Sequence, residues 1–327
     1  MASSSEEAVA AGPISFEEIE AAGERLAGSV IRTPLVRLGV QDAPAEVYLK
    51  LESLQPTGSF KVRGAGNALA LADPQQVAAG VWTSSAGNMA QALAWHARRR
   101  RLPCRVVVPD TAPGTKLEGV RRLGGTIEEV PFAEWIELFS TRQRNGMQGL
   151  FVHPFSDRAV MAGNGTIGVE ILEDLPDVDA VLIPYGGGGL SCGIASALRV
   201  QKPGVKIYAC EIGTAAPLAP SLAAGEPVEV PFSPSFVDGI GAPVVFPEMF
   251  PLASKLFDGS LVVDIPEVAQ TVRIMAERNR VITEGAGAVP VAAALEGMAG
   301  GGKVVCVVSG GNIDSAKLTT ILQGGTP

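Results

Sequence analysis

Residues 55–65 read Gln-Pro-Thr-Gly-Ser-Phe-Lys-Val-Arg-Gly-Ala, with the lysine at position 61. Pro56 and Gly58 predict a turn, and the alanine-rich run over residues 62–71 predicts a helix directly after it. Lys61 therefore stands at a turn-to-helix junction, where backbone N–H groups lack partners. Helix N-termini favour anions, so an amine here is either simply exposed or has a specific role. Its small and apolar neighbours favour the specific role, because they do not form a solvated charged face.

On both sides of this stretch, apolar runs typical of strands alternate with runs typical of helices. A capping-box pattern, Ser15 with Glu18, predicts a helix over residues 16–26. Further helices are predicted at 88–100 and 115–123, and strands at 46–51, 81–83, 105–108, 126–130, 180–183, 206–211, 261–263 and 304–308. This alternation predicts parallel sheets covered by helices on both faces.

The composition narrows the class of protein. A chain of 327 residues is long for one hydrophobic core, which favours two domains. Its net charge of -8 argues against nucleic acid or an acidic membrane surface as a partner. No apolar run approaches the roughly 20 residues of a membrane span, and no signal peptide is visible, so we expect a cytoplasmic protein without a membrane partner. The four cysteines are widely spaced, which favours buried thiols over disulfides or metal ligands.

A loop of small polar residues follows the strand predicted at 81–83. Residues 83–89 read Thr-Ser-Ser-Ala-Gly-Asn-Met. A strand-to-helix turn of this kind offers unpaired N–H groups and hydroxyls to a carboxylate. An ordinary loop with a capping asparagine explains the same pattern, so both interpretations stay open on these residues alone.

Four consecutive glycines, Gly186 to Gly189, lie between a predicted strand and a helix expected to begin near Ser191. Glycine lets successive N–H groups converge on one point, and the helix behind them adds a favourable dipole. The pattern predicts a phosphate site, although it lacks the Lys-Ser/Thr pair of a nucleotide P-loop. A flexible linker is the alternative. Replacing Gly187 or Gly188 by Val is expected to weaken phosphate binding with little loss of folding.

Three further segments stand out. Ser309 begins Ser-Gly-Gly-Asn directly after the last predicted strand, where a hydroxyl suits a ligand that the backbone approaches closely. His153 begins His-Pro-Phe-Ser-Asp, and Ala162 begins Ala-Gly-Asn-Gly-Thr-Ile-Gly. Histidine often serves in acid–base chemistry, but a buried structural histidine beside a proline turn is the favoured interpretation of His153.

Together these segments resemble, in the same order and over nearly the whole chain, the motifs of fold type II pyridoxal-phosphate (PLP) enzymes. The likeness is to the threonine/serine dehydratase and serine racemase group. It implies an α/β fold of two domains, with twisted, mainly parallel sheets flanked by helices, as in the tryptophan synthase β family. It also implies a large PLP-binding domain (1–78 and 153–327), a small domain (79–152) carrying the carboxylate loop, and a homodimer.

The resemblance assigns roles to individual residues. Lys61 would be the catalytic residue and would form the Schiff base with PLP. The glycine loop would bind the phosphate, Ser309 would face the pyridine nitrogen, and Asn88 would bond the 3-hydroxyl. The implied cofactor-binding residues are Phe60, Lys61, Asn88, Gly186, Gly187, Gly188, Gly189, Leu190, Gly239, Glu284 and Ser309. The implied substrate-binding residues are Ser85, Ala86, Gly87, Asn88 and Met89.

The implied reaction is β-elimination from a hydroxy amino acid of the L-threonine or L-serine type, giving a 2-oxo acid and ammonia. A serine at the pyridine nitrogen leaves that nitrogen essentially neutral, which suits rapid expulsion of a leaving group. The alternatives are elimination from another β-substituted amino acid (3-hydroxyaspartate or phenylserine), amino-acid racemisation, and PLP binding without turnover. The intact Lys61 and carboxylate loop argue against the last of these.

The chain departs from the family's pattern at several positions. Met89 stands where relatives commonly have His, and Asn164 replaces a Gln. Ala86 stands where serine racemases carry a second catalytic serine. Met89 and Trp135 together indicate an apolar or unusual pocket for the substrate side chain.

The divalent-cation site of some relatives is also expected to be lost. Glu211 fits its first position, but the residue six positions on is Pro217 instead of Asp. Since a hard cation needs several oxygen ligands, the sequence predicts no metal.

Overall fold

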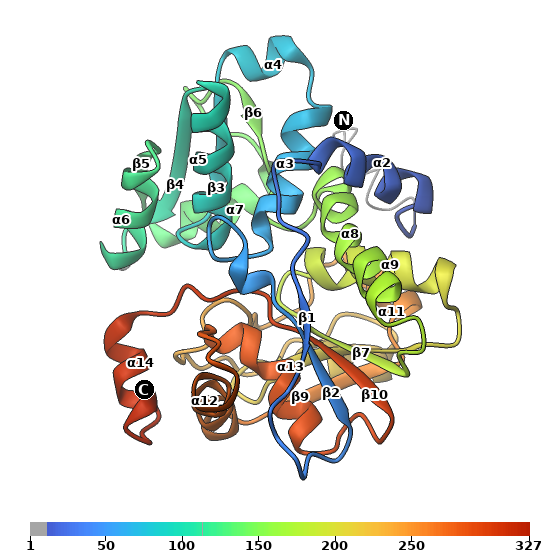
Figure 1. Cartoon of the computed structure of the whole chain (residues 1–327). Coiled ribbons are helices and arrows are strands. Elements are labelled where there is room, and N and C mark those ends of the chain that lie inside the picture. The colour runs from blue at the N-terminus through green and yellow to red at the C-terminus, as the bar shows by residue number, and fades with distance from the viewer. Residues whose placement is uncertain (1–11, 113) are drawn as a thin grey trace.

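Two β-sheets organise the computed structural model, which describes residues 12–112 and 114–327. The larger sheet has the strand order β1-β2-β10-β7-β8-β9 and the smaller one β5-β4-β3-β6. The smaller sheet lies in the upper part of Figure 1 and the larger sheet in the lower part. Helices flank both sheets, which confirms the α/β fold expected from the alternating pattern.

The larger sheet is parallel except at one edge, where β1 runs antiparallel to β2. Its strands are β1 (Leu35–Arg37), β2 (Glu46–Lys50), β7 (Ala180–Pro184), β8 (Lys206–Ile212), β9 (Gly259–Val263) and β10 (Lys303–Val307). The neighbours β2, β10 and β7 end at the same edge, because parallel strands share their direction.

The smaller sheet is parallel throughout. Its strands are β3 (Val81–Ser84), β4 (Cys104–Pro109), β5 (Thr126–Val130) and β6 (Leu150–Phe151). All four fall inside residues 79–152, the segment expected to form the small domain. The domain boundaries themselves stay a prediction.

The helices cover the faces of the sheets and connect their strands. They are α2 (Phe16–Leu26), α3 (Lys61–Leu71), α4 (Pro74–Ala78), α5 (Asn88–Arg100), α6 (Gly114–Arg122), α7 (Phe132–Thr141), α8 (Arg158–Asp174), α9 (Gly189–Gln201), α10 (Leu218–Ala224), α11 (Phe250–Leu256), α12 (Ile265–Ile274), α13 (Gly285–Leu295) and α14 (Ser315–Leu322). A short 3₁₀ turn at Glu52–Leu54 follows β2, and the π-helical turn Met275–Asn279 follows α12. Within the described residues, no helix has both the length and the apolar character needed to cross a membrane.

Local signals placed most elements correctly. The predicted helices 16–26 and 88–100 coincide with α2 and α5. The predicted capping box is present, since the Glu18 N–H donates to Ser15 Oγ at 3.3 Å and the Ser15 N–H donates to Glu18 Oε2 at 3.0 Å. The eight predicted strands end within two residues of the observed ones.

Helix α8 was not predicted, because glycines interrupt its sequence. Those glycines permit close helix packing instead: a Cβ on Gly163 would lie 2.5 Å from the Arg63 carbonyl oxygen of α3. A Cβ on Gly165 or Gly168 would lie 2.9 Å from a backbone carbonyl oxygen of α9. Tight packing against both neighbours therefore overrides the low helix propensity of glycine.

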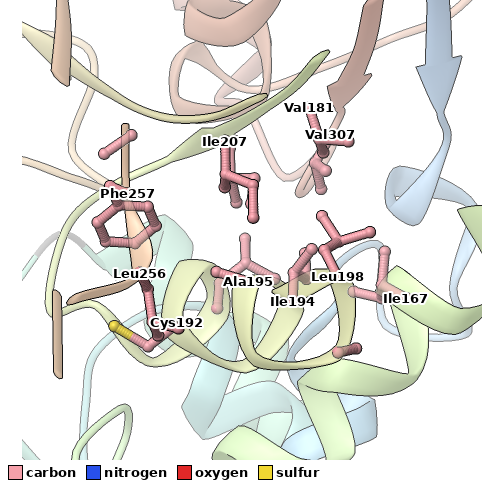
Figure 2. Packing of buried hydrophobic residues seen from close by; sticks show 14 of the residues in the cluster. Ile167, Val181, Cys192, Ile194, Ala195, Leu198, Ile207, Leu256, Phe257 and Val307 are labelled. Atoms are coloured by element: carbon pink, nitrogen blue, oxygen red, sulfur yellow. The ribbon is translucent and has the colours of Figure 1, made fainter. Parts of the chain in front are cut away.

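Each face of the larger sheet contributes to its own hydrophobic cluster. Val181 and Ile183 of β7 belong to the cluster that includes α8 and α9, whereas Ala180 and Leu182 belong to the one that includes α12 and α13. This is the two-residue alternation of a strand buried on both faces. Figure 2 shows Val181, Ile207 and Val307 pointing from the sheet toward α9.

Candidate active site

Lys61 is the first residue of α3 and Phe60 is the N-cap, as the turn-to-helix junction predicted. Its Nζ donates a hydrogen bond of 2.6 Å to the backbone oxygen of Pro154. Burial lowers the pKa of Lys61 to about 8, against the opposing attraction of Glu284. A larger share of this amine is therefore uncharged near neutral pH than for an ordinary lysine, as a nucleophile or base requires.

The segment before Lys61 is paired with the segment after β10. The Phe60 N–H donates to the Ser309 carbonyl at 3.0 Å, and the Gly311 N–H donates to the Gly58 carbonyl at 2.8 Å. Ser59 and Gly310 form an antiparallel bridge between these two bonds. The structure therefore brings Ser309, which is buried, next to the lysine turn although 248 positions separate it from Lys61.

His153 builds the turn that receives Lys61. Its Nδ1 accepts hydrogen bonds from the N–H groups of Phe155 (3.2 Å) and Ser156 (2.8 Å), and its Nε2 lies 3.2 Å from the Phe139 carbonyl oxygen. The ring is thus neutral, with Nε2 as the donor. Burial, together with the positive charge of Arg142, lowers its pKa to about 3. These contacts support the structural interpretation of His153, since they fix the backbone on either side of Pro154.

The glycine loop leaves β7 and ends at the N-terminus of α9. Gly188 adopts φ +87°, a left-handed conformation that favours glycine, and Gly189 begins the helix. The Asn164 side chain, from α8, donates to the Gly189 carbonyl at 3.1 Å. A glycine-rich turn followed by a helix of 13 residues gives N–H groups and a dipole suited to a phosphate.

One expectation about this loop is wrong. Gly187 was expected to be small only so that its backbone could approach an anion. In the structure a Cβ on Gly187 would overlap the ring of Phe155, and one on Gly189 would lie 2.5 Å from the Phe155 carbonyl oxygen. Substitution at Gly187 therefore disturbs the protein's own packing, so the expected mild effect on folding does not hold.

The loop after β3 is partly exposed from Ser85 to Asn88. Ser85 Oγ accepts a hydrogen bond from the Gly87 N–H at 3.3 Å, which closes a tight turn ahead of α5. Ala86 lies between them and presents only a methyl group. The loop and the helix N-terminus behind it match the expected surroundings of a carboxylate.

Asn88, the first residue of α5, connects this loop to the larger sheet. Its Nδ2 donates to both carboxylate oxygens of Glu284, at 2.8 and 3.1 Å. Glu284 caps α13, and its Oε1 would lie 3.4 Å from a Cβ on Gly239 and 2.6 Å from one on Gly310. Asn88, Gly239 and Glu284, all expected to face one ligand, therefore lie close together, and Ser309 directly precedes Gly310.

Met89 and Trp135, which together indicated an apolar pocket for the substrate side chain, belong to different hydrophobic clusters. Met89 is 1% exposed and belongs to the hydrophobic cluster formed by α3, α5 and the smaller sheet. Trp135, on α7, packs against Phe132 and Phe139 with ring centroids 5.8 and 4.8 Å away. The Met89 side chain therefore supports the loop from the core, whereas residues 85–88 are partly exposed.

A buried network of charges behind Lys61 was not predicted. Arg63, two residues along α3, is 1% exposed and bonds Glu52 at 2.8 and 2.9 Å and Glu170 at 2.6 Å. Lys50, fully buried, lies 2.6 Å from Glu170. Although burial opposes it, the two carboxylates raise the pKa of Arg63. The network joins β2, α3 and α8 and so fixes the helix that carries Lys61.

The Glu211 carboxylate is occupied by hydrogen bonds. It accepts from the N–H groups of Leu218 (2.9 Å) and Ala219 (3.1 Å) at the start of α10, and from Ser260 Oγ (2.6 Å). Burial raises the pKa of Glu211 against these donors. Among the described residues, no three His, Cys, Asp or Glu side chains are grouped to hold a metal ion.

These features fit the cofactor that the resemblance implies. Lys61 offers an amine of lowered pKa, and the glycine loop with α9 offers an anion site. Ser309, which follows β10, is buried beside the lysine turn, and a Cβ at position 310 would lie against Asn88 and Glu284. PLP has an aldehyde, a phosphate group and an aromatic ring nitrogen, and these suit the Lys61 amine, the glycine loop and Ser309 respectively.

Comparison with known proteins agrees with this geometry. The chain is 39% identical, over 94% of its length and 78% of the relative's, to an L-threonine ammonia-lyase of Geobacter sulfurreducens. It resembles the structure of maize serine racemase, with a TM-score of 0.88, 32% identity and coverage of 95% and 97%. It also resembles the processed form of threonine deaminase isoform 2 from Solanum lycopersicum, with a TM-score of 0.83, 30% identity and 95% of both chains covered.

The family model described as pyridoxal-phosphate dependent enzyme matches residues 26–310, which include Lys61, the glycine loop and Ser309. The match covers well over half of the chain, and it runs through both sheets. The chain therefore belongs to the family of pyridoxal-phosphate dependent enzymes.

Proposed function

We propose that this protein is a PLP-dependent ammonia-lyase that acts on L-threonine or L-serine and releases a 2-oxo acid and ammonia. The observation that carries the proposal is the 39% identity to an L-threonine ammonia-lyase over 94% of the chain. The convergence of Lys61, Asn88, Glu284, Ser309 and the glycine loop supports it.

The residues that would hold the cofactor are Phe60, Lys61, Asn88, Gly239, Glu284, Ser309 and the segment 186–190. When bound, PLP supplies an electron-withdrawing ring that stabilises negative charge at the substrate α-carbon. Lys61 would bind it covalently through Nζ, and the N-terminus of α9 would hold its phosphate. The Ser309 hydroxyl, buried just after β10, would face the ring nitrogen.

Lys61 is also the residue that removes the α-proton. Its neutral amine accepts the proton at Nζ, and the Pro154 carbonyl, 2.6 Å from Nζ, then holds the resulting ammonium. The lowered pKa of Lys61 suits this base role, because a base works best when its pKa lies near the working pH.

The loop residues that would bind the substrate carboxylate are Ser85, Ala86, Gly87 and Asn88. They precede the N-terminus of α5, whose dipole favours an anion. Their partial exposure supports the role. Met89 was expected in this set, and its burial assigns it to supporting the loop.

Racemisation is the second candidate, since maize serine racemase is a structural relative. Ala86 argues against it, because a methyl group cannot return a proton to the substrate. Elimination from 3-hydroxyaspartate or phenylserine is a third candidate and differs only in the substrate side chain.

Steady-state ammonia and 2-oxo acid release over a panel of amino acids tests the proposal. The panel contains L-threonine, L-serine, 3-hydroxyaspartate and phenylserine, with Lys61→Ala as the inactive control. We expect the highest kcat/KM with L-threonine or L-serine. A higher value with either of the other two would overturn the substrate assignment, and release of no ammonia from any of them would overturn the activity.

We propose that catalysis is independent of divalent cations. The Glu211 carboxylate already accepts three hydrogen bonds, and Pro217 supplies no side-chain oxygen. Activity and melting temperature should therefore survive a chelator. Activation by Mg²⁺ or Ca²⁺ of more than about twofold would contradict this, since such cations act through oxygen ligands.

We propose a cytoplasmic homodimer. Leu54 and Ile31 are apolar and 51% and 46% exposed. Both lie beside Gln55, whose side chain bonds the Ile31 backbone at 3.0 and 2.8 Å, and self-association would cover them. The four cysteines are free and buried, as is usual in a reducing compartment. Light scattering on the purified protein measures the oligomeric state, and a monomer would contradict the proposal.

A further inference from the structure

Asn312, the last residue of the Ser-Gly-Gly-Asn segment, lies outside every role assigned so far. Its Nδ2 donates two hydrogen bonds of 2.8 Å, one to the Thr57 carbonyl oxygen and one to Asn88 Oδ1. Asn312 therefore connects the lysine turn, the end of β10 and the first residue of α5.

The nitrogen of a side-chain amide donates hydrogen bonds and its oxygen accepts them. The hydrogen bonds of Asn312 therefore fix which way the Asn88 amide is oriented. A carbonyl oxygen can only accept, so Thr57 requires the nitrogen of Asn312 to face it. The second hydrogen of that nitrogen needs an acceptor, so Asn88 must present its oxygen. The Asn88 nitrogen then points the other way, toward the Glu284 carboxylate at 2.8 and 3.1 Å.

Gly58 makes room for this contact. It adopts φ +72°, and a Cβ at this position would lie 2.6 Å from Asn312 Oδ1. The glycine that turns the chain ahead of Lys61 thus also admits the Asn312 amide. The Gly311 N–H, one residue earlier, is bonded to the Gly58 carbonyl at 2.8 Å, so the backbone of Asn312 is fixed as well.

We propose that Asn312 is a positioning residue that holds the Asn88 amide with its NH₂ group directed into the cofactor site. This deepens the proposed function and rests on it in one respect: Asn88 is taken as a ligand of the cofactor. Asn312 acts through Asn88 and does not touch the cofactor. Without it the Asn88 amide is held by the Glu284 carboxylate alone, and its oxygen loses the donor that directs it away from the site.

Asn312→Asp is the sharpest variant because it keeps the shape. A carboxylate has no hydrogen to give Thr57 or Asn88 Oδ1. It attracts the Asn88 nitrogen instead and turns the oxygen of Asn88 toward Glu284 and the site. Asn312 is exposed, so the core is untouched and the variant should fold. Asn312→Ala only releases the amide and should have a smaller effect.

The matched control is Asn279→Asp. Asn279 also joins two segments, donating to the Arg37 carbonyl at 3.0 Å and accepting from the Gly39 N–H at 2.9 Å, but it contacts none of the site residues named above. It undergoes the same chemical change and the same change of charge.

The measurement is PLP affinity of the apoenzyme by titration, with the absorption maximum of the bound cofactor as a second readout. We expect Asn312→Asp to weaken PLP binding about tenfold and to shift the absorption maximum, and Asn279→Asp to change neither. In an Asn88→Ala background, Asn312→Asp should add less than about twofold, because the residue it acts through is gone.

Wild-type affinity and spectrum in Asn312→Asp would overturn the proposal. So would an equal loss in both backgrounds, since it would show that Asn312 acts on the lysine turn or through charge alone. Ammonia release by the wild type is scored separately. A wild type that binds PLP at Lys61 but releases no ammonia would sink the proposed reaction and leave the test of Asn312 intact.

Discussion

Two opposing effects act on the pKa of Lys61. Burial disfavours its ammonium form, and the Glu284 carboxylate favours it. The first prevails, so the amine loses its proton near pH 8 instead of near 10.5. The hydrogen bond to Pro154 keeps the nitrogen in place in either form.

The covalent attachment of PLP to apoenzyme should follow this pKa. Only the neutral amine attacks an aldehyde, and its share grows as pH rises. The rate should increase about tenfold per pH unit below pH 8 and level off above it. Stopped-flow absorbance measures the rate, and borohydride followed by peptide mapping locates the label on Lys61. A rate that keeps rising beyond pH 9.5, or a label on another lysine, would contradict the assignment.

His153 offers a test of a structural against a catalytic histidine. His153→Phe leaves the Phe155 and Ser156 N–H groups without their acceptor, so the free energy of unfolding should fall by about 3 kcal/mol. His153→Asn, which keeps an acceptor oxygen, should lose less. Urea denaturation of the apoenzymes measures both. Because the pKa of His153 is about 3, it should give no inflection in the pH–rate profile between pH 5 and 8. An inflection there that disappears in His153→Asn would show an acid–base role.

At the scale of single residues, the sequence predicts the candidate chemical groups but not the residues that position them. Lys61 and Ser309 could be found because each stands in a local pattern beside a turn. Asn312, Glu52 and the Pro154 carbonyl act through partners 224, 11 and 93 positions away. No local pattern reports such partners, because only the fold brings them together.

The glycine loop shows how one element serves two purposes. Gly188 is needed for its backbone conformation, while Gly187 and Gly189 are needed because Phe155 occupies the space beside them. The run of glycines correctly predicted a turn between a strand and a helix, and the anion site there stays a prediction. The packing against Phe155 could not be predicted, since it depends on the turn that His153 builds.

Gly187→Ala should therefore weaken PLP binding and also destabilise the apoenzyme by about 1–3 kcal/mol, because the new methyl group overlaps the Phe155 ring. Gly204→Ala is the matched control, as a Cβ at Gly204 meets nothing within 4 Å. Titration with PLP and urea denaturation measure the two effects. Adding Phe155→Leu should restore part of the stability. An apoenzyme as stable as the wild type in Gly187→Ala would show that the ring moves aside freely.

The helices were predicted less consistently than the strands, because contacts between elements decide some of them. α2 begins with a capping box and α5 ends in a run of arginines, which favours a helix C-terminus, and the bounds of both were predicted to the residue. α8 is rich in glycine and its helical character comes from α3 and α9, against which it packs. Contacts between elements decide such a helix, and local propensity does not.

In the whole molecule the two sheets supply different parts of the site. The larger sheet provides the lysine turn, the glycine loop and Ser309 from the ends of β2, β7 and β10. The smaller sheet provides the carboxylate loop from the end of β3, and Asn88 joins the two through Glu284. In the proposed function the substrate would be held from one sheet and deprotonated from the other, so the outcome of the reaction would depend on what each sheet contributes.

Elimination should greatly exceed racemisation for this reason. Racemisation needs a second acid on the face of the α-carbon that Lys61 does not reach. The carboxylate loop offers Ala86, whose methyl group carries no proton, and Ser85, whose hydroxyl accepts from the Gly87 N–H within the turn. Loss of a positioned acid–base group typically costs about 10²–10⁴-fold in rate, so D-isomer should appear only in traces beside the 2-oxo acid. Ala86→Ser should raise the ratio of racemisation to elimination, whereas Ala223→Ser on the exposed end of α10 should not. Chiral chromatography of the remaining L-substrate, run beside an oxo-acid assay, measures the ratio. If the wild type formed D-isomer as fast as ammonia, another group would have to supply the proton, and the assignment of the loop to carboxylate binding alone would be wrong.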